Sequence, residues 1–165
     1  MEKGFLTPQE ITESYSKIGV QKVNSSVLRL FILGMLAGAF IAFASEGSNT
    51  AIHTIESVGL GKALAGALFS TGLMLVLVAG GELFTGNCLI VISCIEKKTS
   101  WAGMLRNWLI VYAGNFVGSL LLAWFILQSG QLDFSAGMLG GFTIKTEAYK
   151  TGLSFTNAFY MGILC

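Results

Sequence analysis

Apolar residues occur along this chain in long continuous runs, and the short stretches between the runs hold nearly all of the charges. The runs cover about residues 27–44, residues 63–95, about residues 107–128, and a last stretch from near Leu153 to Cys165. A helix of about 20 apolar residues is long enough to cross the hydrocarbon core of a membrane. The pattern therefore predicts an all-α integral membrane protein.

The second run is interrupted by the sequence Gly-Gly-Glu-Leu-Phe-Thr-Gly-Asn at residues 80–87. Glu82 is the only charged side chain in residues 63–95. Non-helical backbone is tolerated at membrane depth only where it is buried in protein or lines a water-filled cavity. Interrupted helices of this kind are also the best indication of a transport site in a sequence. We therefore expect a broken membrane helix with a solute path beside the break.

The chemistry of the break indicates the kind of solute. A carboxylate at membrane depth costs a few kcal/mol, so Glu82 either accepts hydrogen bonds from free N–H groups of the loop or takes part directly in conduction. Thr85 is placed to cap the second half-helix, whose positive dipole end suits an anion. These residues predict a small anionic solute that passes near Leu83, Phe84 and Thr85.

The polar segment before the first run has the signature of an amphipathic helix over residues 7–23. Thr7 is the expected N-cap, Pro8 follows at the first helical position, and Glu10 completes a capping box. The apolar positions that share one face are Ile11, Tyr15 and Ile18. We expect this helix to lie in the membrane interface or beneath the pore mouth, where it could gate the pore.

The distribution of basic residues predicts the orientation in the membrane. Seven of the ten Lys and Arg residues lie within residues 1–29 or 97–106, on one predicted side. Under the positive-inside rule that side is cytoplasmic. We therefore expect a multi-pass protein of the plasma membrane, with a cytoplasmic N-terminal helix at 1–26 followed by a channel domain at 27–165.

The opposite, outer side is expected to hold two Gly- and Ser-rich loops, at about residues 45–62 and 129–152. Their acidic residues are Glu46, Glu56, Asp133 and Glu147. His53, the only histidine, is expected to be a solvated loop residue. Lys150 stands just before the last apolar run, and two interpretations are open: an interfacial anchor, or a cation that concentrates anions at the pore mouth.

Two of the apolar runs carry glycines that are four residues apart. The pairs are Gly34 with Gly38 and Gly114 with Gly118. Because a GxxxG pattern lets helix backbones approach closely, each of these helices is expected to pack tightly on a neighbour.

Composition excludes several classes of protein. Hydrophobic residues make up 53% of the chain and charged residues 12%, whereas an ordinary soluble domain is about 25% charged. A net charge of +1 without a basic stripe argues against a nucleic-acid partner. Cys88, Cys94 and Cys165 lack zinc-ligand spacing and are expected to be small core residues. We expect no metal and no cofactor.

The same residues carry a resemblance to a known family. The stretch from Phe69 to Leu73, the break at 80–87, the motif Gly-Asn-Phe-Val-Gly at 114–118, and Lys150 before a final helix resemble the formate/nitrite transporters. Among the branches of that family, the chain is most similar to the clostridial hydrosulfide-ion channels.

The resemblance implies a homopentamer in which each protomer has an aquaporin-like pore, formed by two inverted halves of three helices. It implies that hydrophobic constrictions are formed or bordered by Phe69, Leu73, Leu83 and Phe84. It further implies that Thr85 bonds a central histidine and that Lys150 attracts the anion. That histidine lies on the fifth helix of the family and is expected beyond Cys165, so we expect this sequence to be part of a longer chain.

The leading hypothesis is a channel for a small monovalent weak-acid anion, with hydrosulfide, formate and nitrite as candidates. A proton-coupled carrier for formate or nitrite is the alternative. Two more distant alternatives are a membrane enzyme with Glu82 as general base and a structural helical assembly. The sequence offers no nucleophile, metal cluster or cofactor motif to work with Glu82, so we expect no enzymatic activity.

Overall fold

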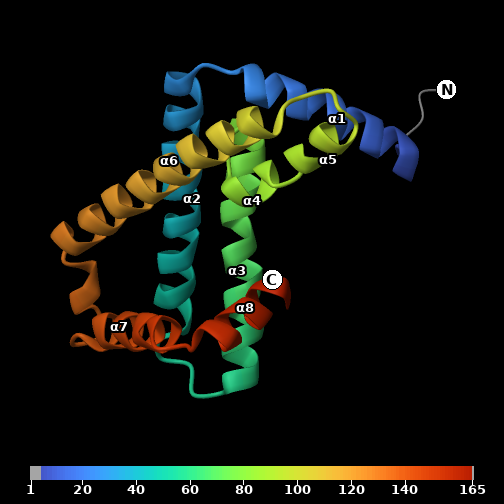
Figure 1. Cartoon of the computed structure of the whole chain (residues 1–165). Coiled ribbons are helices and arrows are strands. Elements are labelled where there is room, and N and C mark those ends of the chain that lie inside the picture. The colour runs from blue at the N-terminus through green and yellow to red at the C-terminus, as the bar shows by residue number, and fades with distance from the viewer. Residues whose placement is uncertain (1–4, 165) are drawn as a thin grey trace.

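The computed structural model describes residues 5–164, and every regular element in that range is helical (Figure 1). The elements are α1 (Pro8–Asn24), α2 (Val27–Ile52), α3 (Val58–Ala79), α4 (Phe84–Asn87), α5 (Ile90–Ile95), α6 (Trp101–Gln128), the 3-10 helix η1 (Gln131–Asp133), α7 (Met138–Thr151) and α8 (Phe155–Leu164). Helices α2, α3 and α6 are long and apolar enough to cross a membrane. The predicted all-α membrane class is therefore confirmed.

Two residues used in the sequence arguments, Lys3 and Cys165, lie outside the described residues. The other two cysteines are free thiols. Cys94 is buried beside Met104 and Ile90, as expected of a small core residue, whereas Cys88 is only half-buried.

Helices α2 and α6 pack against each other through their predicted glycine pairs. A Cβ atom on Gly38 would lie 2.0 Å from the backbone oxygen of Asn115, and one on Gly118 would lie 1.9 Å from that of Met35. Both distances are far below van der Waals contact, and the obstructing atoms belong to backbone. The absence of a side chain at these glycines is what lets the two helix axes approach, which confirms the GxxxG prediction.

Helix α1 begins as predicted. Thr7 Oγ1 accepts from the N–H of Glu10 at 3.3 Å, while the Glu10 carboxylate accepts from the N–H of Thr7 at 2.7 Å. The helix packs through its small residues Ser16 and Gly19, and Ser93 Oγ of α5 donates to the backbone oxygen of Ser16 at 2.8 Å. The predicted apolar face remains exposed, at Ile11, Tyr15 and Ile18.

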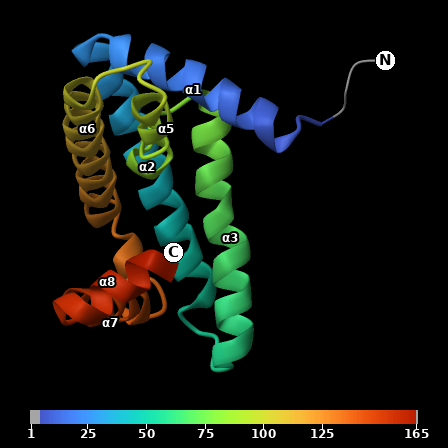
Figure 2. The same ribbon diagram turned by 45° about the vertical axis from the view of Figure 1, so that its right-hand side comes forward.

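Different short helices lie at the two ends of the helical bundle. Helices α1 and α5 lie together at the end where α2 begins, whereas α7 and α8 lie at the other end, across the ends of α2 and α6 (Figures 1 and 2). The N-terminal helix and the helix that carries Lys150 are thus at opposite ends of the bundle.

The prediction of two outer loops was wrong in part. Helix α2 continues past Ala44 to Ile52, because polar side chains in its last turns find partners on neighbouring elements. Ser48 Oγ donates to the backbone oxygen of Ala65 at 3.3 Å, and Asn49 Nδ2 donates to Thr143 Oγ1 at 3.4 Å. The second connection contains η1 and α7 rather than loop alone.

His53 is not a solvated loop residue as expected. It is the C-cap of α2 and is half-buried. Its ring Nδ1 lies 2.7 Å from the backbone oxygen of Thr50, and Nε2 lies 2.8 Å from Ser135 Oγ. The ring therefore ties the end of α2 to the segment before α7.

Candidate functional site

The break in the second apolar run is confirmed, and a glycine makes it. Helix α3 ends at Ala79, and Gly80 adopts a left-handed conformation with φ of 67°. The Gly80 N–H donates to the backbone oxygen of Leu77 and the Gly81 N–H donates to that of Val76, at 3.3 and 2.8 Å. Glycine adopts positive φ at no steric cost, so the sequence stops the helix where the apolar run still continues.

The side chain of Asn115 in α6 binds the non-helical backbone that follows Gly80. Asn115 Oδ1 accepts from the N–H of Phe84 at 2.9 Å, and Asn115 Nδ2 donates to the backbone oxygens of Glu82 and Gly34, each at 2.8 Å. The Glu82 N–H donates to the backbone oxygen of Leu33 at 3.1 Å. Polar backbone groups inside a membrane need such partners because no water replaces them.

The sequence left two roles open for Glu82, and the structure does not show the first of them: no N–H group of the loop donates to its carboxylate among the described residues. Those groups are taken by the backbone oxygen of Leu33 and by Asn115. Glu82 Oε2 instead accepts from Lys22 Nζ of α1 at 2.6 Å and from Asn87 Nδ2 at 2.8 Å. Lys22 entered the sequence argument only as one basic residue among several, so its role at the break was missed.

Two buried asparagines extend this ion pair into a network. Asn87 Oδ1 accepts from Lys22 Nζ at 2.8 Å, and Asn87 Nδ2 also donates to Asn107 Oδ1 at 2.9 Å. Asn107 Nδ2 donates to the backbone oxygen of Lys22 at 3.1 Å. Trp108 Nε1 donates to the backbone oxygen of Asn87 at 2.9 Å. The network fixes α1 to the break and to α6. Asn107 and Asn115, amides within an apolar run, were the signal in the sequence that could have revealed both contacts.

The second half of the broken segment is shorter than expected, and Thr85 does not cap it. Instead of one helix to residue 95, α4 and α5 are separated by a turn at Cys88 and Leu89. Leu83 occupies the N-cap position of α4 and makes no side-chain cap bond. Helix α4 starts at Phe84, whose N–H donates to Asn115, and this is two residues before the start at Gly86 that a Thr85 cap requires. The side chain of Thr85 is left exposed.

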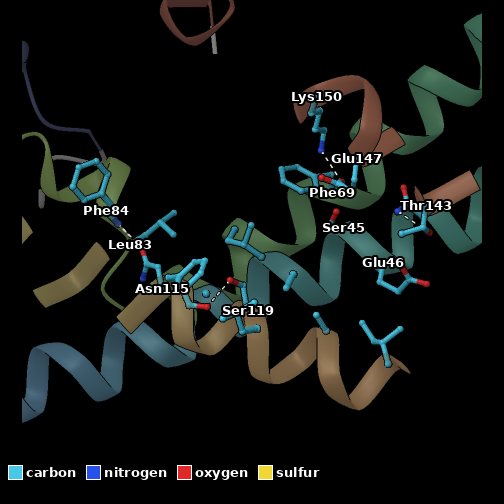
Figure 3. Close-up of a pocket in the computed structure, with 18 of the residues that line it drawn as sticks. Ser45, Glu46, Phe69, Leu83, Phe84, Asn115, Ser119, Thr143, Glu147 and Lys150 are labelled. Carbon is cyan, nitrogen blue, oxygen red and sulfur yellow. Dashed lines mark hydrogen bonds and ion pairs between the residues drawn. The ribbon is translucent and has the colours of Figure 1, made fainter. Parts of the chain in front are cut away.

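A groove of about 700 Å³ runs beside the break, and none of the side chains that form the Glu82 carboxylate network lines it (Figure 3). It is bounded by α2, α3, α6, α7 and the residues just after the break. It collects five of the seven residues predicted for the pore, namely Phe69, Leu83, Phe84, Thr85 and Lys150. Neither Leu73 nor Glu82 lines it. The Phe84 ring is positioned by edge contacts with Trp108 and Tyr112, at centroid distances of 5.8 and 5.5 Å.

The groove is apolar near the break and polar at its other end, beside α7. The polar residues of that end are Ser45, Glu46, Asn49, Thr143, Glu147 and Lys150. Lys150 Nζ lies 3.2 Å from Glu147 Oε1, and the two side chains are 57% and 53% exposed. An ion pair this exposed contributes about 0–1 kcal/mol, so an anion in the groove can compete with Glu147 for the ammonium group.

A carboxylate at the α1 end of the bundle provides a test of how α1 is held. Glu96 follows α5, and its Oε2 accepts from Lys98 Nζ and from Ser16 Oγ of α1, both at 2.6 Å. These two hydrogen bonds, that of Lys98 foremost, lower the pKa of Glu96 below its ordinary value of 4.5. A carboxyl group whose pKa is lower in the folded state than in the unfolded chain stabilises the fold at any pH above its ordinary pKa. That stabilisation is lost as the pH falls through the folded-state pKa.

We therefore expect acidification below about pH 4.5 to loosen α1 from α5. Hydrogen–deuterium exchange of the α1 amides, corrected for intrinsic rates, should accelerate in that range while α3 amides stay protected. In the Glu96→Gln variant the protection of α1 should be lower at neutral pH and should no longer change with acid. Equal acid sensitivity of the variant and the original protein would contradict this role for Glu96.

Comparison with known proteins gives one family. A sequence model described as formate/nitrite transporter matches residues 9–165. A formate channel FocA of Haemophilus influenzae is 35% identical over 162 residues, which cover 97% of this chain and 57% of the relative. FocA of Escherichia coli strain K12 is 34% identical with the same coverage, and a probable formate transporter of Methanothermobacter thermautotrophicus is 32% identical over 96% of this chain. The chain thus spans about 57–60% of the length of these relatives.

Proposed function

Because this chain belongs to the formate/nitrite transporter family, we propose that it forms one wall of a membrane pathway for a small monovalent weak-acid anion. The observation that carries the proposal is the groove in which Phe69, Leu83, Phe84, Thr85 and Lys150 meet. The names of several relatives make formate the first candidate. Hydrosulfide and nitrite are the other candidates that the family resemblance implies.

The groove offers an anion two successive environments. Lys150 at the outer end attracts it by charge, and the weak pair with Glu147 leaves the ammonium available. The apolar residues beside the break then oppose a bare ion, because burying an unpaired charge is very costly. A weak acid avoids that cost by crossing as the neutral species, whereas chloride cannot. Selection of weak acids over chloride follows from this order of environments.

The assembly and orientation belong to the same proposal. We place the protein in the plasma membrane as a homopentamer, with α1 on the cytoplasmic side and α7 outside. Thr85 is exposed and lines the groove, where it would bond the central histidine that the family resemblance implies. A channel and a proton-coupled carrier share these features, and they differ in whether each anion moves with a fixed number of protons.

The proposal is tested by flux into liposomes that contain the full-length protein, with formate, nitrite, hydrosulfide and chloride compared over a range of external pH. Flux of at least one weak acid, with little chloride, supports the pathway and identifies the solute. No flux of any of the four, from protein that is folded and inserted, refutes it. Simultaneous recording of internal pH distinguishes the carrier from the channel.

We expect Lys150→Ala to reduce influx at low outer anion concentration by about threefold to tenfold, with a smaller effect at saturation, because the substitution removes attraction rather than the path. Lys145→Ala is the matched control, since Lys145 lies on the same helix and is exposed but does not line the groove. Equal loss in both variants would instead indicate that the two lysines act as membrane anchors.

A further inference from the structure

One acidic residue of the groove has no role in the pathway described so far. Glu46 lies in α2 at the outer end of the groove (Figure 3). Only 7% of the residue is exposed, and its Oε1 atom is buried without a hydrogen-bond partner among the described residues. Buried polar atoms in folded proteins are nearly always bonded, so an oxygen without a partner calls for a ligand.

The surroundings of Glu46 supply no dedicated counter-charge. On α7, Glu147 and Lys150 also line the groove, and they pair with each other. On α2 itself, Asn49 is a side-chain hydrogen-bond partner of Glu46, which leaves Oε1 as the atom without one. His53 at the end of α2 interacts with Glu46 through charge alone, because its two ring nitrogens contact Thr50 and Ser135. Residues 107–128 of α6 carry no Asp, Glu, Lys, Arg or His.

Four further charged residues near this end of the bundle are exposed and do not line the groove, namely Glu56 before α3, Lys62 of α3, Asp133 of η1 and Lys145 of α7. No Lys or Arg among the described residues therefore forms an ion pair with Glu46. An ionised carboxylate with so little solvent and no paired cation is costly, and a bound proton removes that cost.

We propose that Glu46 is a proton-binding residue of the groove, whose protonation from the outer solution permits an anion to be held beside Lys150. The inference rests on the proposed function, because it concerns the same pathway. When Glu46, Glu147 and Lys150 are all ionised, the outer end of the groove carries one net negative charge. When Glu46 is protonated the net charge is zero, and the proton balance is one proton taken up from the outer solution for each Glu46.

The anion and the Glu46 proton can then combine. Transfer of that proton to the bound anion leaves Glu46 as a carboxylate and produces the neutral acid, which is the species able to pass the apolar part of the groove. No oxidation or reduction is involved, and Glu46 is ready again once it takes another proton from outside. Acid on the outer side should therefore increase influx through Glu46 as well as through the concentration of neutral acid.

The test is the Glu46→Gln variant of the full-length protein, because glutamine has nearly the same shape and stays neutral. At neutral external pH, where the carboxylate repels the anion, we expect tracer binding of formate at the groove to be about threefold or more stronger than in the original protein. Net uptake should lose the part of its acid stimulation that Glu46 contributes. Glu46→Asp, which keeps a titratable group, should retain the acid stimulation.

Infrared difference spectroscopy on a step in pH measures the proton directly. The original protein should gain the carbonyl band of a protonated carboxylic acid on acidification, and Glu46→Gln should lack that band. Glu56→Gln is the matched control, since Glu56 is exposed in the connection before α3 and does not line the groove. The inference would be overturned if the band persisted in Glu46→Gln. It would also be overturned if formate binding and uptake in Glu46→Gln had the same pH profile as in the original protein.

The two proposals fail separately. If no weak acid crosses in any variant while the Glu46 band is present, the pathway is refuted but the proton site stands. If formate crosses and the band is absent from the original protein, the pathway stands and the proton site is refuted.

Discussion

Replacing Asn115 with alanine is expected to destabilise the break strongly, by about 2–5 kcal/mol, and to abolish flux. The substitution removes the side-chain amide, whose oxygen accepts one hydrogen bond and whose NH2 group donates two. It leaves the N–H of Phe84 and the backbone oxygens of Glu82 and Gly34 without these partners, in a place where water cannot easily replace them. Because Leu83 and Phe84 depend on that backbone for their position, the groove should lose its shape together with its stability.

Equilibrium unfolding of the full-length protein in mixed micelles, followed by circular dichroism, measures the stability change, and liposome flux measures the function. Ser119→Ala is the control, since Ser119 lies on the same helix and lines the same groove but bonds only within α6, to the backbone oxygen of Phe116. Its effect on stability should stay below about 0.5 kcal/mol. An Asn115→Ala protein as stable and active as Ser119→Ala would show that the break does not depend on α6.

The second large effect is expected from Gly118→Ala, which adds one carbon at the crossing of α2 and α6. That carbon would lie 1.9 Å from the Met35 oxygen and 2.6 Å from the Met35 carbonyl carbon, so the helices must move apart. Overpacking of this kind costs about 1–3 kcal/mol, and the cost is at the upper end here because the obstacle is backbone. Separation of the helices also displaces Asn115 from the break.

Gly66→Ala is the matched control for this prediction. Gly66 lies within α3, is exposed, and has no atom within 4 Å of its would-be Cβ. Alanine favours a helix over glycine by about 1 kcal/mol, so this substitution should leave the stability unchanged or raise it. When both variants are unfolded under the same conditions, the free energy of unfolding should fall in Gly118→Ala and should stay the same or rise in Gly66→Ala. Equal changes would mean that α2 and α6 do not pack as closely as the structure has them.

Much of the fold could be predicted from the sequence because the responsible features are local. The apolar runs that form most of α2, α3 and α6 are recognised by comparing their number of residues with the thickness of a membrane. The start of α1 follows from Thr7 and Glu10, which lie three residues apart. The end of α3 follows from Gly80, whose own backbone freedom permits the turn.

The site was predicted less completely, because its contacts join distant parts of the chain. Phe69, Leu83, Phe84, Thr85 and Lys150 do line one groove, but Leu73 does not. The roles assigned to these residues remain proposals.

The sequence by itself determined the membrane class, the three long helices, the break and the glycines of the α2–α6 crossing, since each depends on residues within one segment. Only the tertiary structure decided the partners of the break. Lys22 is 60 positions from Glu82, and Asn115 is 31 positions from Phe84. It also decided that Thr85 does not cap α4 and that the Oε1 atom of Glu46 is buried without a hydrogen-bond partner among the described residues. The physical reason is that a hydrogen bond depends on ångström distances between groups whose separation along the chain does not indicate their separation in space.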